Sequence, residues 1–180
     1  HIGTLTKVGV PTFPRTLKQV FWFSKPNPDG YLGYDEYLIA VTDTAAVYSI
    51  KLDMMLTNDW IYRYPSARGK VGGSSYRYNG KDVFLLASEK DGLMMFDGEE
   101  FTLFDQSPKV DTMCVHSERV FITKPDDKFT VWFSDDFDPG NWNVSLNEGG
   151  FISLQKNEGE ILNMFSFLNQ LYVIRESGIY

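Results

Sequence analysis

The sequence repeats one unit four times, in which an apolar segment, a short polar turn and a second apolar segment follow one another. In the clearest copy, residues 83–87 and 93–96 flank a turn at 89–92. The other copies have their apolar segments at 37–41 and 47–50, at 120–123 and 129–133, and at 171–174 and 179–180. With Tyr37, Val83, Val120 and Leu171 taken as equivalent, the copies are 37 to 51 residues apart, close to the roughly 40–50 residues of a four-stranded propeller blade. We therefore expect an all-β fold of antiparallel, β-propeller-like blades, which an aromatic content of 16% also favours.

Turn chemistry indicates strands on both sides of the turns. Asn79-Gly80 and Asp97-Gly98 each stand between apolar segments, where a tight hairpin requires positive φ. Residues 74–78, 82–88, 93–96 and 100–104 are thus expected to form the four strands of one complete blade. A further strand is expected at 19–24, followed by a loop at 25–30.

One segment, residues 43–56, has a competing interpretation. It contains good helix formers, and Asp43 is suited to cap a helix. The repeat favours a strand at 47–50 instead, with a helical turn at 53–56 as an open alternative.

The four units are expected to form a single domain over residues 1–180, since no linker separates them. The fourth unit stops inside its second apolar segment, which makes a partial propeller of about three and a half blades. A propeller normally closes by pairing its last blade with its first. We therefore expect a fragment of a longer chain, or else strands supplied by the N-terminal segment or by a partner chain.

The charge balance weighs against polyanionic partners. Asp and Glu outnumber Lys and Arg by 24 to 17, for a formal net charge of -7, so phosphate backbones would on average be repelled. We expect no nucleic-acid partner, and we interpret the basic residues at 63–77 as solvated strand edges: Arg63, Arg68, Lys70 and Arg77. No apolar stretch approaches the roughly 18 residues that span a bilayer, so no membrane partner is expected.

The residues show no recognisable catalytic or cofactor-binding pattern. His1 and His116 are far apart, with no Cys at zinc-ligand spacing; we interpret His116 as a surface turn residue and Cys114 as a structural thiol in a strand. The glycine-rich residues 69–75 lack the spacing of a phosphate-binding loop or a nucleophile elbow. We expect no cofactor, and no residue is singled out as catalytic.

The most distinctive local sequence is the acidic segment 134–142. Its three carboxylates, Asp135, Asp136 and Asp138, are oxygen ligands of the kind that calcium prefers. The segment lacks the regular ligand spacing and terminal Glu of an EF-hand. Calcium binding is therefore the less favoured of its interpretations.

Two further interpretations of this segment are structural. Ser134, Asp136, Gly140 and Trp142 resemble a distorted Asp-box of sialidase-type propellers, in which the spacing from Asp to Gly is shorter. The favoured interpretation is a structural turn, in which Asp side chains accept hydrogen bonds from backbone N–H groups and Trp142 covers the blade edge.

Part of the chain resembles structural proteins of tailed bacteriophages. The matching residues are 131–135 (Val-Trp-Phe-Ser-Asp), 138–142 (Asp-Pro-Gly-Asn-Trp), 159–161 (Gly-Glu-Ile) and 171–174 (Leu-Tyr-Val-Ile). In that group a strand ending in Phe-Ser precedes an Asp-Pro loop and a Trp, and the next blade opens with Gly-x-Ile and continues into Leu-Tyr-Val. The resemblance covers about residues 111–180, and residues 1–56 depart from it. It implies a virion component of the neck or tail, which contacts other virion subunits or copies of itself, and it carries over no catalytic residue.

Two functions from different classes therefore remain open. A non-enzymatic structural or binding propeller, the favoured function, predicts ordered multimers and apolar or aromatic patches on blade edges. A carbohydrate-active, sialidase-like or glycosidase-like propeller enzyme, or a glycan-binding module, predicts a pocket near the propeller axis with convergent carboxylates or arginines. Carboxylate pairs follow no spacing rule in a sequence, whereas the arginines show no equivalent placement across the repeats: Arg15, Arg63, Arg68, Arg77, Arg119 and Arg175.

Overall fold

The computed structural model describes residues 16–27, 33–52, 59–63, 66–146 and 148–180. These residues form β-strands and two short 3-10 helices, without an α-helix. The strands make four antiparallel sheets, each built from strands that are consecutive in the sequence. The all-β, propeller-like fold expected from the repeat is confirmed.

We call the four sheets blades 1 to 4 in chain order. Blade 1 contains β1 (Leu17–Pro26), β2 (Tyr34–Thr42), β3 (Val47–Leu52) and β4 (Ile61–Arg63). Blade 2 contains β5 (Val71–Tyr78), β6 (Lys81–Ser88), β7 (Gly92–Phe96) and β8 (Phe101–Leu103). Blade 3 contains β9 (Thr112–His116), β10 (Arg119–Lys124), β11 (Asp127–Phe133) and β12 (Gly150–Ser153), with the 3-10 helix η1 (Val144–Leu146) before β12. Blade 4 follows the 3-10 helix η2 (Lys156–Glu158) and contains β13 (Ile161–Phe167), β14 (Gln170–Arg175) and β15 (Gly178–Ile179).

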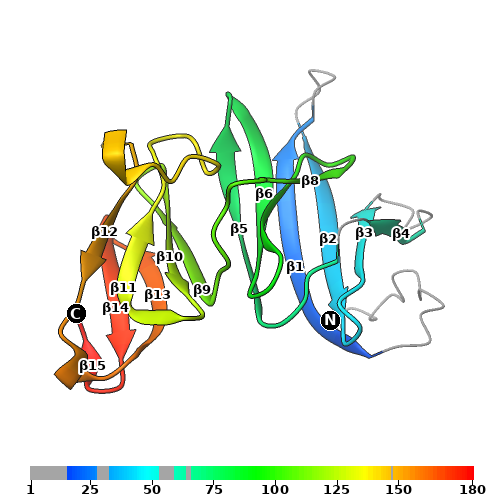
Figure 1. Ribbon diagram of the computed structural model, residues 1–180. Coiled ribbons are helices and arrows are strands. Elements are labelled where there is room, and N and C mark those ends of the chain that lie inside the picture. Colours follow the sequence, from blue (N-terminus) through cyan, green and yellow to red (C-terminus); the bar gives the residue numbers. More distant parts are fainter. Residues whose placement is uncertain (1–15, 28–32, 53–58, 64–65, 147) are drawn as a thin grey trace, which may run out of the picture.

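The blades follow one another around an arc, as in a β-propeller (Figure 1). The first strands of successive blades are neighbours, with β1 against β5, β5 against β9 and β9 against β13. These first strands are therefore the inner ones, and the last strands of blades 1 to 3, which are β4, β8 and β12, are their outer edges. Within the described ranges no comparable contact joins β13 to β1, so blades 1 and 4 each have one face that no described blade covers.

A tight two-residue turn joins the first and second strands in blades 2, 3 and 4. In blade 2 it is the predicted Asn79-Gly80 turn, whose φ angles are 49° and 75°. Residues 117–118 (44° and 59°) and 168–169 (47° and 59°) adopt the same left-handed conformation. Among these three turns, Asn-Gly is the pair that most strongly favours it, so the turn recurs at equivalent places although its residues change.

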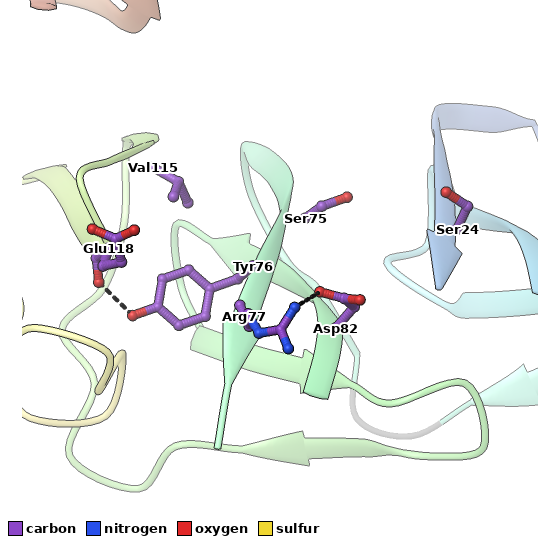
Figure 2. A pocket seen from close by; sticks show the side chains of 7 residues that line it. All are labelled: Ser24, Ser75, Tyr76, Arg77, Asp82, Val115 and Glu118. Atoms are coloured by element: carbon purple, nitrogen blue, oxygen red, sulfur yellow. Dashed lines mark hydrogen bonds and ion pairs between the residues drawn. The ribbon is translucent and has the colours of Figure 1, made fainter. Parts of the chain in front are cut away.

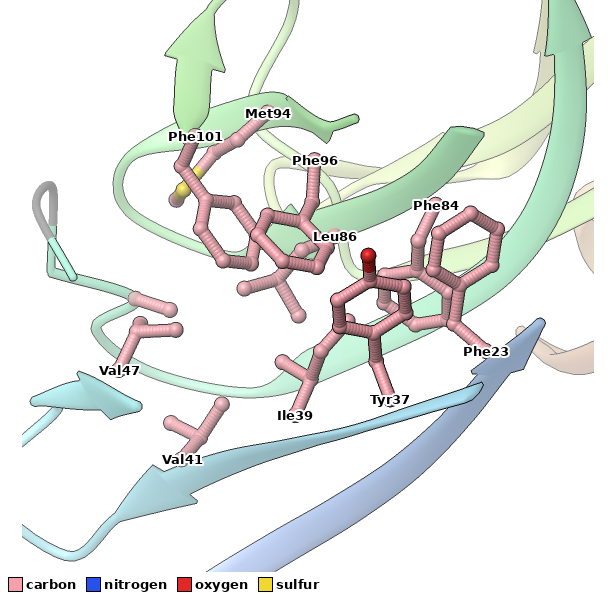
Figure 3. Close-up of a cluster of buried hydrophobic side chains, with 11 residues drawn as sticks. Phe23, Tyr37, Ile39, Val41, Val47, Phe84, Leu86, Met94, Phe96 and Phe101 are labelled. Carbon is pink, nitrogen blue, oxygen red and sulfur yellow. The ribbon is translucent and has the colours of Figure 1, made fainter. Parts of the chain in front are cut away.

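Each junction between successive blades has its own hydrophobic cluster. At the first junction, Phe23 and Tyr37 of blade 1 meet Phe84 and Phe96 of blade 2 (Figure 3). The ring centroids of Phe23 and Phe84 are 6.1 Å apart, and those of Tyr37 and Phe96 are 5.5 Å apart. Separate clusters fill the second and third junctions. Packing between blades therefore provides the core, as in other stacked sheets.

The second strand of each blade contains the residues that the repeat predicts to be equivalent. The side chains of these residues, however, do not all lie on the same face of their strands. Tyr37 and Val83 lie in the cluster shared with the following blade, whereas Val120 and Leu171 contact the cluster shared with the preceding one. The alignment is thus wrong by one residue between the second and third copies, because a shift of one residue turns a side chain to the opposite face of a strand. By face, the residues that match Tyr37 and Val83 are Phe121 and Tyr172.

The competing helix over residues 43–56 is wrong where the structure describes it. Residues 47–52 form β3, which is paired with β2 on one side and β4 on the other. Val47 and Ile50 are buried in this sheet, so packing overrides the helix propensity of the segment. The helical turn considered at 53–56 lies outside the described residues. The loop expected at 25–30 begins later, because β1 extends to Pro26.

The glycine-rich residues 69–75 include the first part of β5. A Cβ atom on Gly73 would lie only 2.3 Å from Cζ of Phe84, so this glycine makes room for the ring at the first blade junction. Gly150 does the same for Phe133, whose Cζ would be 2.2 Å from an added Cβ. Both glycines have a packing role.

Candidate functional site

The acidic segment 134–142 forms a turn after β11, and Ser134 is fully buried at its start. The backbone N–H of Ser134 donates to the carbonyl oxygen of Val120 (3.0 Å), and the backbone N–H of Val120 donates to Ser134 Oγ (3.0 Å). The hydroxyl in turn donates to the carbonyl oxygen of Asp135 (3.0 Å). Ser134 thus continues the hydrogen-bonding between β10 and β11 for one residue beyond the end of β11.

The three carboxylates considered as calcium ligands contact different partners. Asp135 Oδ1 accepts a hydrogen bond from the N–H of Asp136 (2.8 Å), and Asp138 Oδ1 accepts one from the N–H of Gly140 (3.0 Å). The Asp136 carboxylate pairs with Arg119 Nε at 2.7 Å. Over the described ranges, no group of three or more His, Cys, Asp or Glu side chains is arranged to hold a metal ion. The structure therefore does not bring these three side chains together as a cation site.

Gly140 and Trp142 hold the end of the segment against blade 2. Trp142 Nε1 donates to the carbonyl oxygen of Pro139 (3.0 Å), and the indole ring packs against the cluster between blades 2 and 3. A Cβ on Gly140 would lie 2.8 Å from Cδ1 of Phe104, which follows β8. The turn thus contacts two blades at once.

A recess of about 300 Å³ lies beside the inner strands β1, β5 and β9 (Figure 2). Tyr76 Oη donates to the carbonyl oxygen of Glu118 (2.6 Å), and the Arg77 guanidinium pairs with Asp82 at 3.7 Å. Three blades supply the residues that line it: Ser24, Ser75, Tyr76, Arg77, Asp82, Val115 and Glu118. The sequence does not reveal this inner recess, because its residues come from separate repeats. The one available signal was the position of Arg77 and Asp82 on either side of the Asn79-Gly80 turn.

The negative charges of the acidic segment act on the phenol of Tyr76 in the inner recess. Burial raises the pKa of Tyr76 to about 12, and the negative charges of Asp138, Glu118, Asp136 and Asp135 act in the same direction. An ionised Tyr76 would lose solvation and face several carboxylates. Tyr76 therefore remains a neutral hydrogen-bond donor over the physiological pH range.

We expect Tyr76→Phe to reduce the loss of stability at alkaline pH. The unfolded chain releases this proton near pH 10, whereas the folded state retains it to about pH 12. The stability from this group is therefore fully present below about pH 10 and is lost between pH 10 and about pH 12. Over that window the free energy of unfolding should fall less in the variant, and at pH 8 it should be lower by about 1 kcal/mol because the hydrogen bond to Glu118 is lost.

Urea denaturation at a series of pH values measures both effects, with Tyr34→Phe as a control at an exposed position. Identical pH dependence in the wild type and in Tyr76→Phe would contradict the prediction.

A wider recess of about 540 Å³ adjoins the inner recess, and Arg77 and Asp82 line both. Its charged residues have both signs, and Lys25 Nζ donates to the carbonyl oxygen of Asp97. Burial would raise the pKa of Asp97, but hydrogen bonds from the N–H groups of Glu100 and Glu99 outweigh it and lower the pKa below its usual value. Asp97 is thus held as a carboxylate and does not suit the role of a general acid.

The described arginines do not converge on the inner strands. Only Arg77 lines the inner recess among the five that the structure describes. Arg15 lies outside the described residues. The others contact different groups in different parts of the fold: Arg63 stacks over Phe96, Arg68 pairs with Asp91, Arg119 with Asp136 and Arg175 with Glu158. The cluster of arginines expected for an anionic sugar is absent from the described part of the chain.

His116 and Cys114 both lie in β9. His116 ends this strand, and its Nδ1 is 2.9 Å from Ser166 Oγ of blade 4. The His116 side chain is half-buried at the junction between blades 3 and 4. The sequence had predicted a surface position in a turn. Cys114 is buried in the cluster between blades 3 and 4, and this burial raises the pKa of its thiol.

No protein-family model matches this sequence, and no curated protein matches it either. No helix in the described ranges has both the length and the apolar character needed to cross a membrane.

Proposed function

We propose that this chain is a non-enzymatic structural or binding protein that acts through protein–protein contacts in the neck or tail of a tailed-bacteriophage virion. The observation that carries the proposal is the exposure of large apolar side chains on the outer-edge strands β4 and β12. These side chains are between 49% and 58% exposed: Ile61, Tyr62, Phe151 and Ile152. Apolar side chains gathered on exposed sheet edges are typical of surfaces that contact other proteins.

The resemblance to bacteriophage proteins supports the virion part of this proposal. Residues 131–133 end β11, and residues 138–142 belong to the turn that follows. Residues 159–161 lead into β13, and residues 171–174 lie in β14. The order of strand, loop and next blade in the bacteriophage pattern is thus also the order of elements in this chain.

The alternative is a carbohydrate-active propeller enzyme or a glycan-binding module. The inner recess favours it, because Arg77 and Asp82 are suited to bond sugar hydroxyl or carboxylate groups. These two side chains already pair with each other, and Glu118, the other carboxylate on the lining, belongs to a different blade. The assembly function accounts for the exposed edges, which the alternative leaves unexplained.

Two measurements test the proposal. Mass spectrometry of purified tailed particles from the source of the gene should detect this chain, and the neighbouring genes should encode portal or tail proteins. Screens of glycan binding and hydrolysis should detect no turnover. Hydrolysis that is lost in Asp82→Asn, or absence of the chain from the particles, would overturn the proposal.

A further inference from the structure

We propose that the wider recess, between blades 1 and 2, binds a neutral, polyhydroxylated ligand of the carbohydrate class and does not hydrolyse it. This inference goes beyond the assembly function, because none of the residues that line the recess belongs to the outer-edge strands β4 and β12.

The walls of the wider recess come from two consecutive blades. Blade 1 contributes Lys25 and Pro26 at the end of β1. Blade 2 contributes the residues around the turn between β5 and β6, and the turn between β7 and β8. The volume of about 540 Å³ falls within the roughly 300–1,000 Å³ that is typical of small-molecule sites. The packing of blade 1 on blade 2 therefore shapes the recess.

The turn between β7 and β8 is held in place from both blades. Lys25 Nζ donates to the carbonyl oxygen of Asp97, and Asp97 Oδ1 accepts hydrogen bonds from the N–H groups of residues 99 and 100 at 2.8 and 3.0 Å. A Cβ added to Gly98 would lie 2.8 Å from the hydroxyl oxygen of Tyr37, so the turn packs closely on blade 1. This wall is thus organised before a ligand arrives, which lowers the cost of binding.

The charges on the lining balance one another. Six of its eight residues are charged, three as cations and three as carboxylates: Lys25, Arg77, Lys81, Asp82, Asp97 and Glu99. An anion would meet the carboxylates, and a cation would meet the ammonium and guanidinium groups. An apolar ligand would remove these charges from water without replacing their hydrogen bonds. The lining therefore favours a ligand that has many polar groups and no net charge.

Two side chains of the lining have unused polar groups. Within the described ranges, neither the Lys81 ammonium nor the Glu99 carboxylate has a hydrogen bond or an ion pair, and both side chains are exposed. The Arg77 guanidinium pairs with Asp82 at 3.7 Å and donates to the carbonyl oxygen of Gly80 at 3.3 Å. It has further N–H groups to offer. The recess thus presents both donors and acceptors to a ligand.

Sugar hydroxyl groups match this mixed lining. Each hydroxyl donates one hydrogen bond and also accepts, so one sugar ring can bond a carboxylate at one position and an ammonium group at another. Hydrogen bonds of this kind, to a charged partner, are stronger than those between neutral groups. Burial would raise the pKa of Asp97, but backbone hydrogen bonds lower it below its usual value. Asp97 is therefore suited to accept from hydroxyl groups and not to protonate a leaving group.

A glycan array followed by isothermal titration calorimetry tests the inference on the purified chain. Neutral oligosaccharides on the array should bind better than acidic or amino-sugar glycans of the same length. The best neutral oligosaccharide, titrated free in solution, should give a Kd of about 1 mM or lower. Raising the salt concentration to about 1 M, where the screening length is roughly 3 Å, should change this Kd by less than about twofold, because the ligand is uncharged.

Two substitutions locate the binding. Lys81→Ala and Glu99→Ala should each raise the Kd about tenfold, because each removes a charged hydrogen-bonding partner. Glu100→Ala is the matched control for Glu99, since Glu100 is exposed in the same turn and does not line the recess. Lys90→Ala is the control for Lys81, since Lys90 is exposed and lines a different recess. Both controls should bind like the wild type.

Circular dichroism checks the fold of each variant, and Lys81→Gln or Glu99→Gln replaces an alanine variant that does not fold. Absence of binding to every neutral glycan, or a preference for charged glycans, would overturn the inference. So would neutral-glycan binding that survives both substitutions. Binding accompanied by hydrolysis would overturn this inference together with the proposed non-enzymatic function. Absence of the chain from virions would overturn the proposed function alone.

Discussion

Replacing Phe84 with alanine is expected to lower the free energy of unfolding by about 3–5 kcal/mol. Phe84 is only 2% exposed and contacts the rings of Phe21 and Phe23 across the first blade junction, at centroid distances of 5.4 and 6.1 Å. Its removal leaves a cavity that Gly73 cannot fill, since this glycine has no side chain. The loss of apolar burial and the cavity therefore act together.

Chemical denaturation monitored by circular dichroism measures this change. Phe137→Ala is the control, because the exposed Phe137 should contribute within about 0.5 kcal/mol. If the two substitutions had similar effects, packing between blades would not be the main source of stability.

Ser134→Ala is expected to lower the free energy of unfolding by about 1–3 kcal/mol. The substitution removes the acceptor of the buried Val120 N–H and the donor to the carbonyl oxygen of Asp135. Alanine offers no replacement, and Ser134 is fully buried, so water does not easily restore these bonds. A buried donor without an acceptor bears the full cost of its desolvation.

The same denaturation experiment measures this variant, with Ser75→Ala on β5 as a control at an exposed position. A large effect at Ser134 and a small one at Ser75 would support the structural-turn interpretation of residues 134–142. Equal stability of Ser134→Ala and the wild type would refute a structural role for this hydroxyl.

The strands could be predicted because the residues that indicate them lie close together in the sequence. Residues 83–87 are apolar without interruption, and Asn79-Gly80 is the residue pair that a tight hairpin favours. The turn at residues 117–118 has the same conformation without those residues. Its approximate position followed only from the repeat, which placed it one residue too early, at residues 116–117.

The inner recess and the faces of the strands were harder to predict. Tyr76 and Glu118 are 42 residues apart, and they meet only because β5 and β9 are neighbouring inner strands. The aligned positions Val83 and Val120 are both apolar, so composition alone does not show that they face opposite blades. The acidic side chains of residues 135–138 gave no indication that Asp136 pairs with Arg119 of β10.

The sequence by itself determined the strands, most of their turns and their grouping into similar blades, because hydrophobic pattern and turn chemistry act between residues close in the chain. Tertiary structure alone decided which face of each strand meets which blade and which charges pair. These features depend on register and on distances between blades, and a shift of one residue, which hardly changes the sequence pattern, reverses them.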